Sequence, residues 1–127
     1  MISGGDGIQI GFDSQGSGPL LVFTHGWVND RTVWNPLIQN LSTDHMAVSW
    51  DLRGHGESGT PPPGSYSREH ALSDLRAVLD AVGRPAVLVG HSLGGYLSLA
   101  HALECPEDIA GLVLIAAGPG FRNAEAR

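Results

Sequence analysis

The sequence predicts one α/β domain built on a doubly wound, mainly parallel sheet. Short apolar runs of strand length alternate with longer amphipathic stretches along the chain. Two of the runs are almost continuously apolar, which is typical of strands inside a parallel sheet. Strands that alternate with helices imply right-handed crossovers that place helices on both faces. With 127 residues, the chain is long enough for one hydrophobic core and too short for two domains.

The first half of the chain contains three predicted strands and one predicted helix. Residues 8–12 alternate apolar and polar side chains before the turn sequence SQGSGP, and Leu20–Thr24 is a compact apolar run. A helix follows, because apolar side chains recur there at helical spacing: Trp34, Leu37, Ile38 and Leu41. Met46–Trp50 predicts the third strand, and the three consecutive prolines of DLRGHGESGTPPPG exclude regular structure after it.

The second half begins with the clearest helix of the chain. Ser67 is its predicted N-cap, Gly83 its stop, and six apolar side chains between them keep an i, i+3, i+4 rhythm: Ala71, Leu72, Leu75, Val78, Leu79 and Val82. Residues 86–90 predict a strand that leads directly into GHSLGG, and residues 93–103 predict a helix that begins within this segment. Residues 109–117 are nearly continuously apolar, so we expect a strand buried on both faces.

The composition excludes some classes of partner. Seven Lys and Arg against 13 Asp and Glu give a formal net charge of −6, which argues against nucleic acid and against an anionic membrane surface. The single Cys105 cannot form an internal disulfide, and we expect it to be an apolar packing residue. The longest apolar run is too short to span a bilayer, and the N-terminus lacks a secretory signal. We therefore expect a soluble, cytoplasmic protein.

The strongest chemical signal is the segment Gly90-His91-Ser92-Leu93-Gly94, which matches the GxSxG pattern. In this pattern a sharp strand-to-helix turn holds the serine in a strained conformation, so the flanking Gly90 and Gly94 leave room for the backbone. The bare match is weak in a chain rich in Gly and Ser, but its place between a predicted strand and a predicted helix makes it specific. We predict that Ser92 is a nucleophile; the alternative is a tight glycine turn with an incidental serine.

Two further segments follow earlier predicted strands. His25, Gly26 and Trp27 come directly after Leu20–Thr24, and Met46–Trp50 is followed by DLRGHGES, which has the pattern DxRGxGxS. Together with the serine segment, and in the same order and spacing, they resemble the motifs of the α/β-hydrolase family over about residues 8–121. The resemblance implies an α/β-hydrolase core and a serine hydrolase that acts by acyl transfer.

The resemblance also implies roles for the motif residues. Ser92 would attack a carbonyl carbon, and the backbone N–H groups of Trp27 and Leu93 would form the oxyanion hole. A serine argues against the branches of the family that open epoxides or displace halides, since those use aspartate at this position. Ester, lactone, thioester and carbon–carbon bond hydrolysis remain open. The other motif residues are expected to brace the loops structurally: His25, Gly26, Asp51, Arg53, Gly54, His55 and Gly56.

A triad acid and base cannot be assigned within the chain. In the family they follow the nucleophile in the order acid, histidine, but the only histidine after Ser92 is His101, about 13 Å along the predicted helix. His91 is expected to point away from its neighbour Ser92. The resemblance therefore implies that residues 1–127 are the N-terminal part of a single, incomplete α/β-hydrolase domain that lacks the cap and the C-terminal strands.

Two functions are compatible with these motifs. The first is a serine hydrolase for a small ester-like or other carbonyl substrate, inactive as this chain alone and dependent on a second half. The second is a non-catalytic, hydrolase-like module for binding or association. We expect no metal and no organic cofactor, because the sequence has no phosphate loop, dinucleotide fingerprint or clustered ligand set. The strand at residues 109–117 is expected to leave an open sheet edge that favours self-association.

Overall fold

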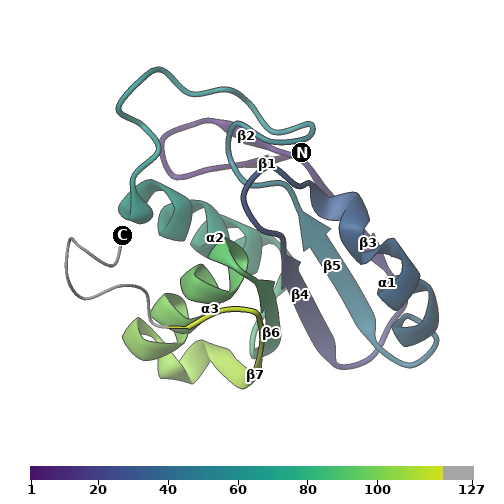
Figure 1. Cartoon of the computed structure of the whole chain (residues 1–127). Helices are drawn as coiled ribbons and strands as arrows, with labels where there is room; N and C mark the ends of the chain where they lie inside the picture. The colour runs from purple at the N-terminus through teal and green to yellow at the C-terminus, as the bar shows by residue number, and fades with distance from the viewer. Residues whose placement is uncertain (119–127) are drawn as a thin grey trace.

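A five-stranded sheet with helices on both faces forms the body of the molecule (Figure 1). The structure is a computed structural model and describes residues 1–118. The strand order is β3–β5–β4–β6–β7. All neighbours are parallel except the antiparallel pair β3–β5, and the strands are β3 (Phe12–Gln15), β4 (Leu20–Thr24), β5 (Met46–Trp50), β6 (Ala86–His91) and β7 (Ile109–Ile115). The predicted mainly parallel, doubly wound sheet is confirmed.

The helices divide between the two faces of the sheet. The short 3₁₀-helix η1 (Arg31–Trp34) and α1 (Asn35–Leu41) lie on one side, and α2 (Arg68–Val82) and α3 (Leu93–Glu104) lie on the other (Figure 1). A second 3₁₀-helix, η2 (Pro106–Asp108), joins α3 to β7, and a small antiparallel ribbon of β1 (Ile2–Ser3) and β2 (Gln9–Ile10) precedes the sheet. No helix among residues 1–118 is long and apolar enough to cross a membrane.

Each face of the sheet carries its own apolar core. Side chains alternate between the faces along a strand, so Val22 of β4 packs toward α2 and α3, while its neighbours Leu21 and Phe23 pack toward α1. The larger core includes Val48, Trp50, Leu75, Leu79, Leu88 and Leu97, and the smaller one includes Trp34, Ile38, Ala47 and Val89. The middle strands are thus buried on both sides, as their continuous apolar sequences predict.

Several predicted boundaries hold at the level of single residues. The predicted strands Leu20–Thr24 and Met46–Trp50 are β4 and β5. Ser67 caps α2 by accepting a hydrogen bond from the backbone N–H of His70, and Gly83 ends the helix with a φ of 115°. The prediction for the N-terminal strand is less accurate. Residues 8–12 are divided between β2 and β3, and β3 extends to Gln15 because its backbone pairs with β5 as far as Ala47.

The prediction that residues 109–117 are buried on both faces is wrong. The strand β7 ends at Ile115, and Val113, Leu114 and Ile115 are 46%, 36% and 40% exposed. The physical reason is its position, because β7 is the last strand of the described sheet and α3 packs against only one of its faces. The described sheet thus has the open edge at β7 that the sequence analysis expected.

Candidate active site

Ser92 lies at the sharp turn between β6 and α3. Its φ of 53° and ψ of −116° place a residue with a side chain in a conformation that glycine ordinarily adopts. The turn is held on both sides, since the Ser92 N–H donates to the Ile115 carbonyl at 2.9 Å and its carbonyl accepts from the Tyr96 N–H at 3.0 Å. The side chain of Ser92 is exposed at the carboxyl end of the sheet. This is the strand–turn–helix placement that the sequence predicts.

The glycines around Ser92 allow main chains to touch. A Cβ atom on Gly90 would lie 2.4 Å from the Gly94 carbonyl oxygen, and one on Gly94 would lie 2.1 Å from the Thr24 carbonyl oxygen. Such distances are far inside van der Waals contact, so neither position accepts a side chain without a backbone shift. The first turn of α3 therefore packs directly on the end of β4.

The turn after β4 lies beside Ser92. A Cβ atom on Gly26 would be 3.3 Å from the Ser92 Cβ. The backbone N–H groups of Trp27 and Leu93 have no hydrogen-bond acceptor among residues 1–118, whereas the N–H of Val28 donates to His55 Nε2 at 3.1 Å. Two unpaired backbone donors next to a serine are the arrangement that an oxyanion hole requires.

His25 is fully buried beneath this turn and bonds to backbone at both ring nitrogens. The Leu52 N–H donates to Nε2 at 3.0 Å, so the ring proton is on Nδ1 and is donated to the Gly26 carbonyl at 2.7 Å. Burial lowers the pKa of His25 and keeps the ring neutral. The ring joins the end of β4 to the loop after β5, and neither nitrogen is free to accept a proton from Ser92.

His55 also connects the turn after β4 to the loop after β5, but its side chain comes from the loop and reaches the turn. Its Nε2 accepts from Val28, and its Nδ1 donates to the Arg53 carbonyl at 2.9 Å. The ring also packs edge-on against Trp27, with 4.9 Å between centroids. His55 thus fixes the Trp27–Val28 segment, in which Val28 has a strained φ of 66°.

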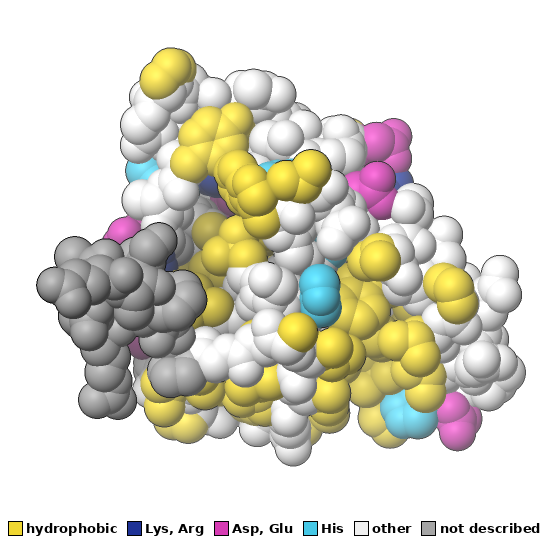
Figure 2. Space-filling view, viewed as in Figure 1, with side chains coloured by type: hydrophobic (Ala, Val, Ile, Leu, Met, Phe, Trp, Pro, Cys, Tyr) yellow, Lys and Arg dark blue, Asp and Glu magenta, His cyan; other side chains and the backbone are white. Residues whose placement is uncertain are grey.

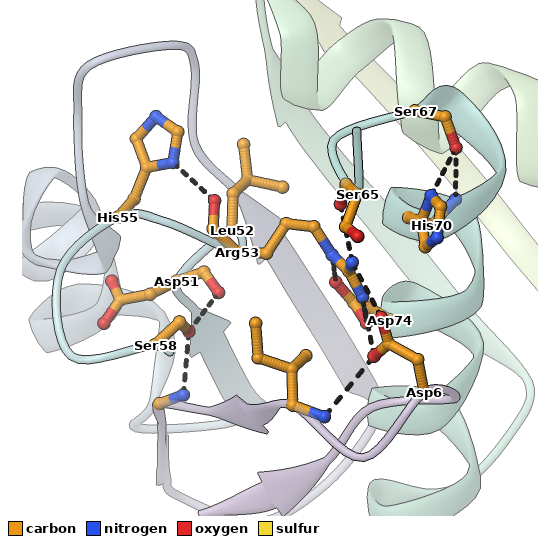
Figure 3. A network of polar contacts seen from close by, with 12 residues as sticks. Asp6, Asp51, Leu52, Arg53, His55, Ser58, Ser65, Ser67, His70 and Asp74 are labelled. Atoms are coloured by element: carbon orange, nitrogen blue, oxygen red, sulfur yellow. Dashed lines mark hydrogen bonds and ion pairs between the residues drawn. The ribbon is translucent and has the colours of Figure 1, made fainter. Parts of the chain in front are cut away.

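Asp51 is the centre of the loop that follows β5. Its buried carboxylate accepts the backbone N–H groups of Arg31 at 2.7 Å and Glu57 at 2.9 Å, and it pairs with the Arg31 guanidinium. Gly56 makes this possible, since a Cβ there would lie 2.4 Å from the carboxyl carbon of Asp51. The Ser58 hydroxyl completes the loop by donating to the Asp51 carbonyl at 2.6 Å (Figure 3).

Arg53 is only 3% exposed, and its guanidinium is surrounded by acceptors (Figure 3). It donates to both carboxylate oxygens of Asp74 on α2, at 2.7 and 2.8 Å, and to both of Asp6 at 3.0 Å. A further hydrogen bond runs to the Ser65 carbonyl at 2.7 Å. Hydrogen bonding to Asp74 raises the pKa of Arg53, so the guanidinium stays charged. The sequence analysis identified Arg53 but missed Asp6 and Asp74, because their pairing links three distant segments.

A cavity of about 390 Å³ opens beside the Trp27 turn. It is lined by Trp27, Val28, Gly54, His55 and Tyr66, and the ring of Tyr66 lies over Gly54, where a Cβ would be 2.6 Å from it. A second cavity of about 430 Å³ lies at the amino ends of the strands, away from Ser92. Hydrophobic side chains also form several exposed patches on the face seen in Figure 2. The first cavity is the one on the side of the Trp27 turn, which lies beside Ser92.

Ser92 has no hydrogen-bonded histidine among residues 1–118. His91 lies near Gly26, whose Cβ position is 3.0 Å from His91 Nδ1, and His101 is buried within α3 and pairs with Asp108. The predicted domain extends to residue 127, but residues 119–127 lie outside the described part. The described site therefore contains an exposed serine at a strained turn beside two backbone N–H groups without acceptors, and no histidine among residues 1–118 is hydrogen-bonded to that serine.

Comparison with known proteins decides the family. A family model described as "alpha/beta hydrolase fold" matches residues 19–126. The chain belongs to the α/β-hydrolase fold family. Its sequence is 35% identical to the 2-(acetamidomethylene)succinate hydrolase of Mesorhizobium japonicum over 109 residues, which cover 85% of this chain and 39% of that protein. It is 37% identical to a pimeloyl-[acyl-carrier protein] methyl ester esterase of Xylella fastidiosa, covering 87% and 41%.

Other relatives have different activities. Epoxide hydrolase 2 of Siraitia grosvenorii is 36% identical, with 85% of this chain and 35% of that protein covered. Among solved structures, a thermophilic esterase from Thermogutta terrifontis superposes with a TM-score of 0.89 at 31% identity, covering 98% of this chain and 47% of that one. The chain spans about 35–41% of the length of these curated relatives. The resemblance to α/β-hydrolases is confirmed, and these relatives include an esterase and an epoxide hydrolase.

The neutral, buried state of His25 predicts that stability depends on pH. The unfolded histidine titrates near ~6.5, and burial lowers the pKa in the folded state. The stabilisation is therefore complete above the unfolded pKa and is lost as pH falls through the folded pKa, because the unfolded chain then binds the extra proton. We expect the free energy of unfolding in urea to decline more steeply below about pH 6.5 in the wild type than in His25→Gln.

The control for this measurement is Ser17→Ala, which changes an exposed residue without a titratable side chain. Its pH dependence should follow that of the wild type. Parallel curves for the wild type and His25→Gln would show that His25 is not held neutral by burial.

The buried hydrogen bonds of Arg53 predict that replacing it lowers the free energy of unfolding much more than replacing Arg68 does. In Arg53→Met the buried carboxylate of Asp74 loses its partner, so we expect a loss of about 3–5 kcal/mol in the free energy of unfolding. The double variant Arg53→Met, Asp74→Leu should recover part of this loss. Arg68→Met is the control, since Arg68 is 39% exposed and water screens its ion pairs with Glu69 and Glu104, so its loss should be much smaller. Equal losses in the two single variants would contradict the network.

Proposed function

We propose that this chain is the nucleophile-bearing part of a serine hydrolase for an ester-like or other carbonyl substrate. The observation that carries the proposal is the exposed Ser92 at a positive φ, beside the N–H groups of Trp27 and Leu93, which have no acceptor within residues 1–118. Strained backbone that places a hydroxyl group beside two free donors costs stability. Acyl transfer is the chemistry that benefits from both features.

Each part of the site then has a defined step. The Ser92 Oγ attacks the carbonyl carbon and loses its proton, and the two N–H groups stabilise the oxyanion of the tetrahedral intermediate. Each such donor is commonly worth about 3 kcal/mol in the transition state. Collapse of the intermediate expels the leaving group, and water then hydrolyses the acyl-serine ester. The cavity lined by Trp27, His55 and Tyr66 would hold the part of the substrate nearest the oxyanion turn.

The proton of Ser92 requires a base from outside the described residues. His25 and His55 use both ring nitrogens in backbone hydrogen bonds, and His101 is paired with Asp108. The chain also spans less than half the length of its relatives. We therefore propose that a second half, in the same polypeptide or in a partner, supplies the acid and the histidine, and that residues 1–127 alone are inactive.

The names of the relatives support a carbonyl substrate only in part. One relative is a methyl ester esterase and another is an epoxide hydrolase. A serine hydroxyl forms an acyl ester readily and returns it to water, whereas the epoxide-opening branch uses a carboxylate at this position. The residue at position 92 therefore favours the esterase side of the family.

A second candidate is a non-catalytic module that binds or associates through its open edge. The observation that favours it is β7, whose apolar Val113, Leu114 and Ile115 are partly exposed at the end of the described sheet. An apolar edge of this kind is a template for further strand pairing. In both proposals the edge pairs with another strand, which in the catalytic one belongs to the second half.

Ester hydrolysis separates the two candidates. We expect the 127-residue chain to release nitrophenol from a short-chain nitrophenyl ester no faster than Ser92→Ala does. A protein that also contains the second half should be active and should lose on the order of a millionfold in kcat in Ser92→Ala, as triad serine hydrolases do. Ser17→Ala, at an exposed serine in a turn, is the control and should retain activity.

Two outcomes would contradict the proposal. Substantial turnover by the 127-residue chain that disappears in Ser92→Ala would show that the base lies within it. Equal background rates for every protein, including the longer one, would favour the non-catalytic module.

A further inference from the structure

Three side chains of metal-binding type meet at the far end of α3. They are His101, Cys105 and Asp108, and one potential ligand atom of each lies within 4.8 Å of the others. His101 Nε2 is 3.0 Å from Asp108 Oδ2. The sequence analysis expected no metal site and treated Cys105 as a packing residue. The available signal was the four-residue spacing of His101 and Cys105, which places both on one side of a helix.

The local backbone explains why the three residues converge. The helix α3 ends at Glu104, and the Cys105 N–H donates to the His101 carbonyl at 2.8 Å. The chain then turns through η2, where the Asp108 N–H donates to the Cys105 carbonyl at 3.0 Å. This turn returns the Asp108 carboxylate to the side of the helix that carries His101.

Burial and charge make the cluster unusual for a structural contact. His101 is fully buried, and its Nδ1 has no hydrogen-bond partner among residues 1–118. Asp108 is 14% exposed at its side chain and contacts Arg84 through Oδ1 at 3.1 Å, which leaves Oδ2 facing His101. The Asp108 carboxylate is thus oriented by its outer partner Arg84, as metal-binding carboxylates usually are.

We propose that His101, Cys105 and Asp108 bind one zinc ion. Imidazole, thiolate and carboxylate are the three ligand types that zinc takes, at distances of about 2.0–2.3 Å. Ligand atoms on a tetrahedral ion of that size lie roughly 3–4 Å apart. The three ligand atoms lie within 4.8 Å of one another, so a small closing movement of the side chains would bring them onto one ion. The sulfur and nitrogen ligands disfavour magnesium and calcium, which prefer oxygen. Binding replaces the His101–Asp108 hydrogen bond and releases the thiol proton of Cys105.

The site is separate from the proposed hydrolase chemistry. From Ser92 to His101 the helix rises about 13 Å, so the ion is too far away to activate a nucleophile or a water there. It instead links the end of α3 to η2, directly before β7. The inference therefore does not depend on the proposed function. The role of the ion is to stabilise the segment that leads into the edge strand β7.

Metal titration of the chain tests the inference directly. We expect the chelator-treated, reduced 127-residue chain to bind one Zn²⁺ per molecule in isothermal titration calorimetry. With Co²⁺ as a spectroscopic probe, we expect a near-ultraviolet thiolate-to-cobalt charge-transfer band. Because the chain has a single cysteine, such a band can come only from Cys105.

Substitutions then test two of the three proposed ligands, Cys105 and Asp108. Cys105→Ala and Asp108→Asn should each weaken Zn²⁺ binding by at least about a hundredfold, the upper end of what loss of an outer partner costs. The matched control is His45→Gln, because His45 also pairs with a carboxylate, at 2.6 Å, but does so away from the cysteine. It should bind zinc like the wild type. Circular dichroism of each variant checks that the fold is retained.

Three results would overturn the inference. The first is that the wild-type chain binds no Zn²⁺ and gives no thiolate-to-cobalt band. The second is that the affinity for Zn²⁺ is unchanged in Cys105→Ala. The third is a stoichiometry of half an ion per chain together with dimer formation, which would place the ion between two chains. If Cys105→Ala does not fold, the cobalt band of the wild type decides the question alone.

Discussion

The close contact between the main chain of α3 and the end of β4 is the constraint on which the site depends. Gly94 has no side chain, so its backbone lies against the Thr24 carbonyl, where a Cβ would approach to 2.1 Å. That contact fixes where the first turn of α3 begins and forces the chain through the turn at Ser92. It also brings the Gly26 turn next to the serine. The positions of Ser92 and of both candidate oxyanion donors therefore follow from the contact between Gly94 and the Thr24 carbonyl.

The loops beside this contact are held mainly by polar side chains that bond to neighbouring backbone. His25 ties the end of β4 to Leu52, His55 ties Val28 to Arg53, and Asp51 ties the same loop to Arg31. Arg53 connects the assembly to α2 through Asp74. The bonds of His25 to Leu52 and of Arg53 to Asp74 are buried, so their loss would leave unpaired polar groups. Together with the more exposed bonds of His55 and Asp51, they specify one loop arrangement. The strain at Val28 and Ser92 persists inside that rigid frame.

The parts of the fold that could be predicted from sequence are those encoded locally. The strands β4 and β5, the Ser67 cap and the turn at Ser92 depend on residues within a few positions of each other, and the structure has each of them as expected. The open edge at β7 was expected, but the exposure of its faces could not be predicted, because an apolar strand is identical in sequence whether or not its far face is covered. The same limit explains the pairing of Arg53 with Asp6 and Asp74, and the meeting of Cys105 with Asp108, since tertiary folding alone brings these residues together.

The contact between Gly94 and the Thr24 carbonyl is tested most directly by the free energy of unfolding of Gly94→Ala. Helix propensity alone predicts that alanine stabilises α3 by about 1 kcal/mol relative to glycine. The contact with Thr24 predicts the opposite sign, a loss of roughly 1–3 kcal/mol in the free energy of unfolding, because the added methyl group must displace backbone. Gly118→Ala, where a Cβ meets no atom of the described residues within 4 Å, is the control and should show little change. A Gly94→Ala variant that is as stable as the wild type, or more stable, would show that the turn at Ser92 is not held by the contact between Gly94 and the Thr24 carbonyl.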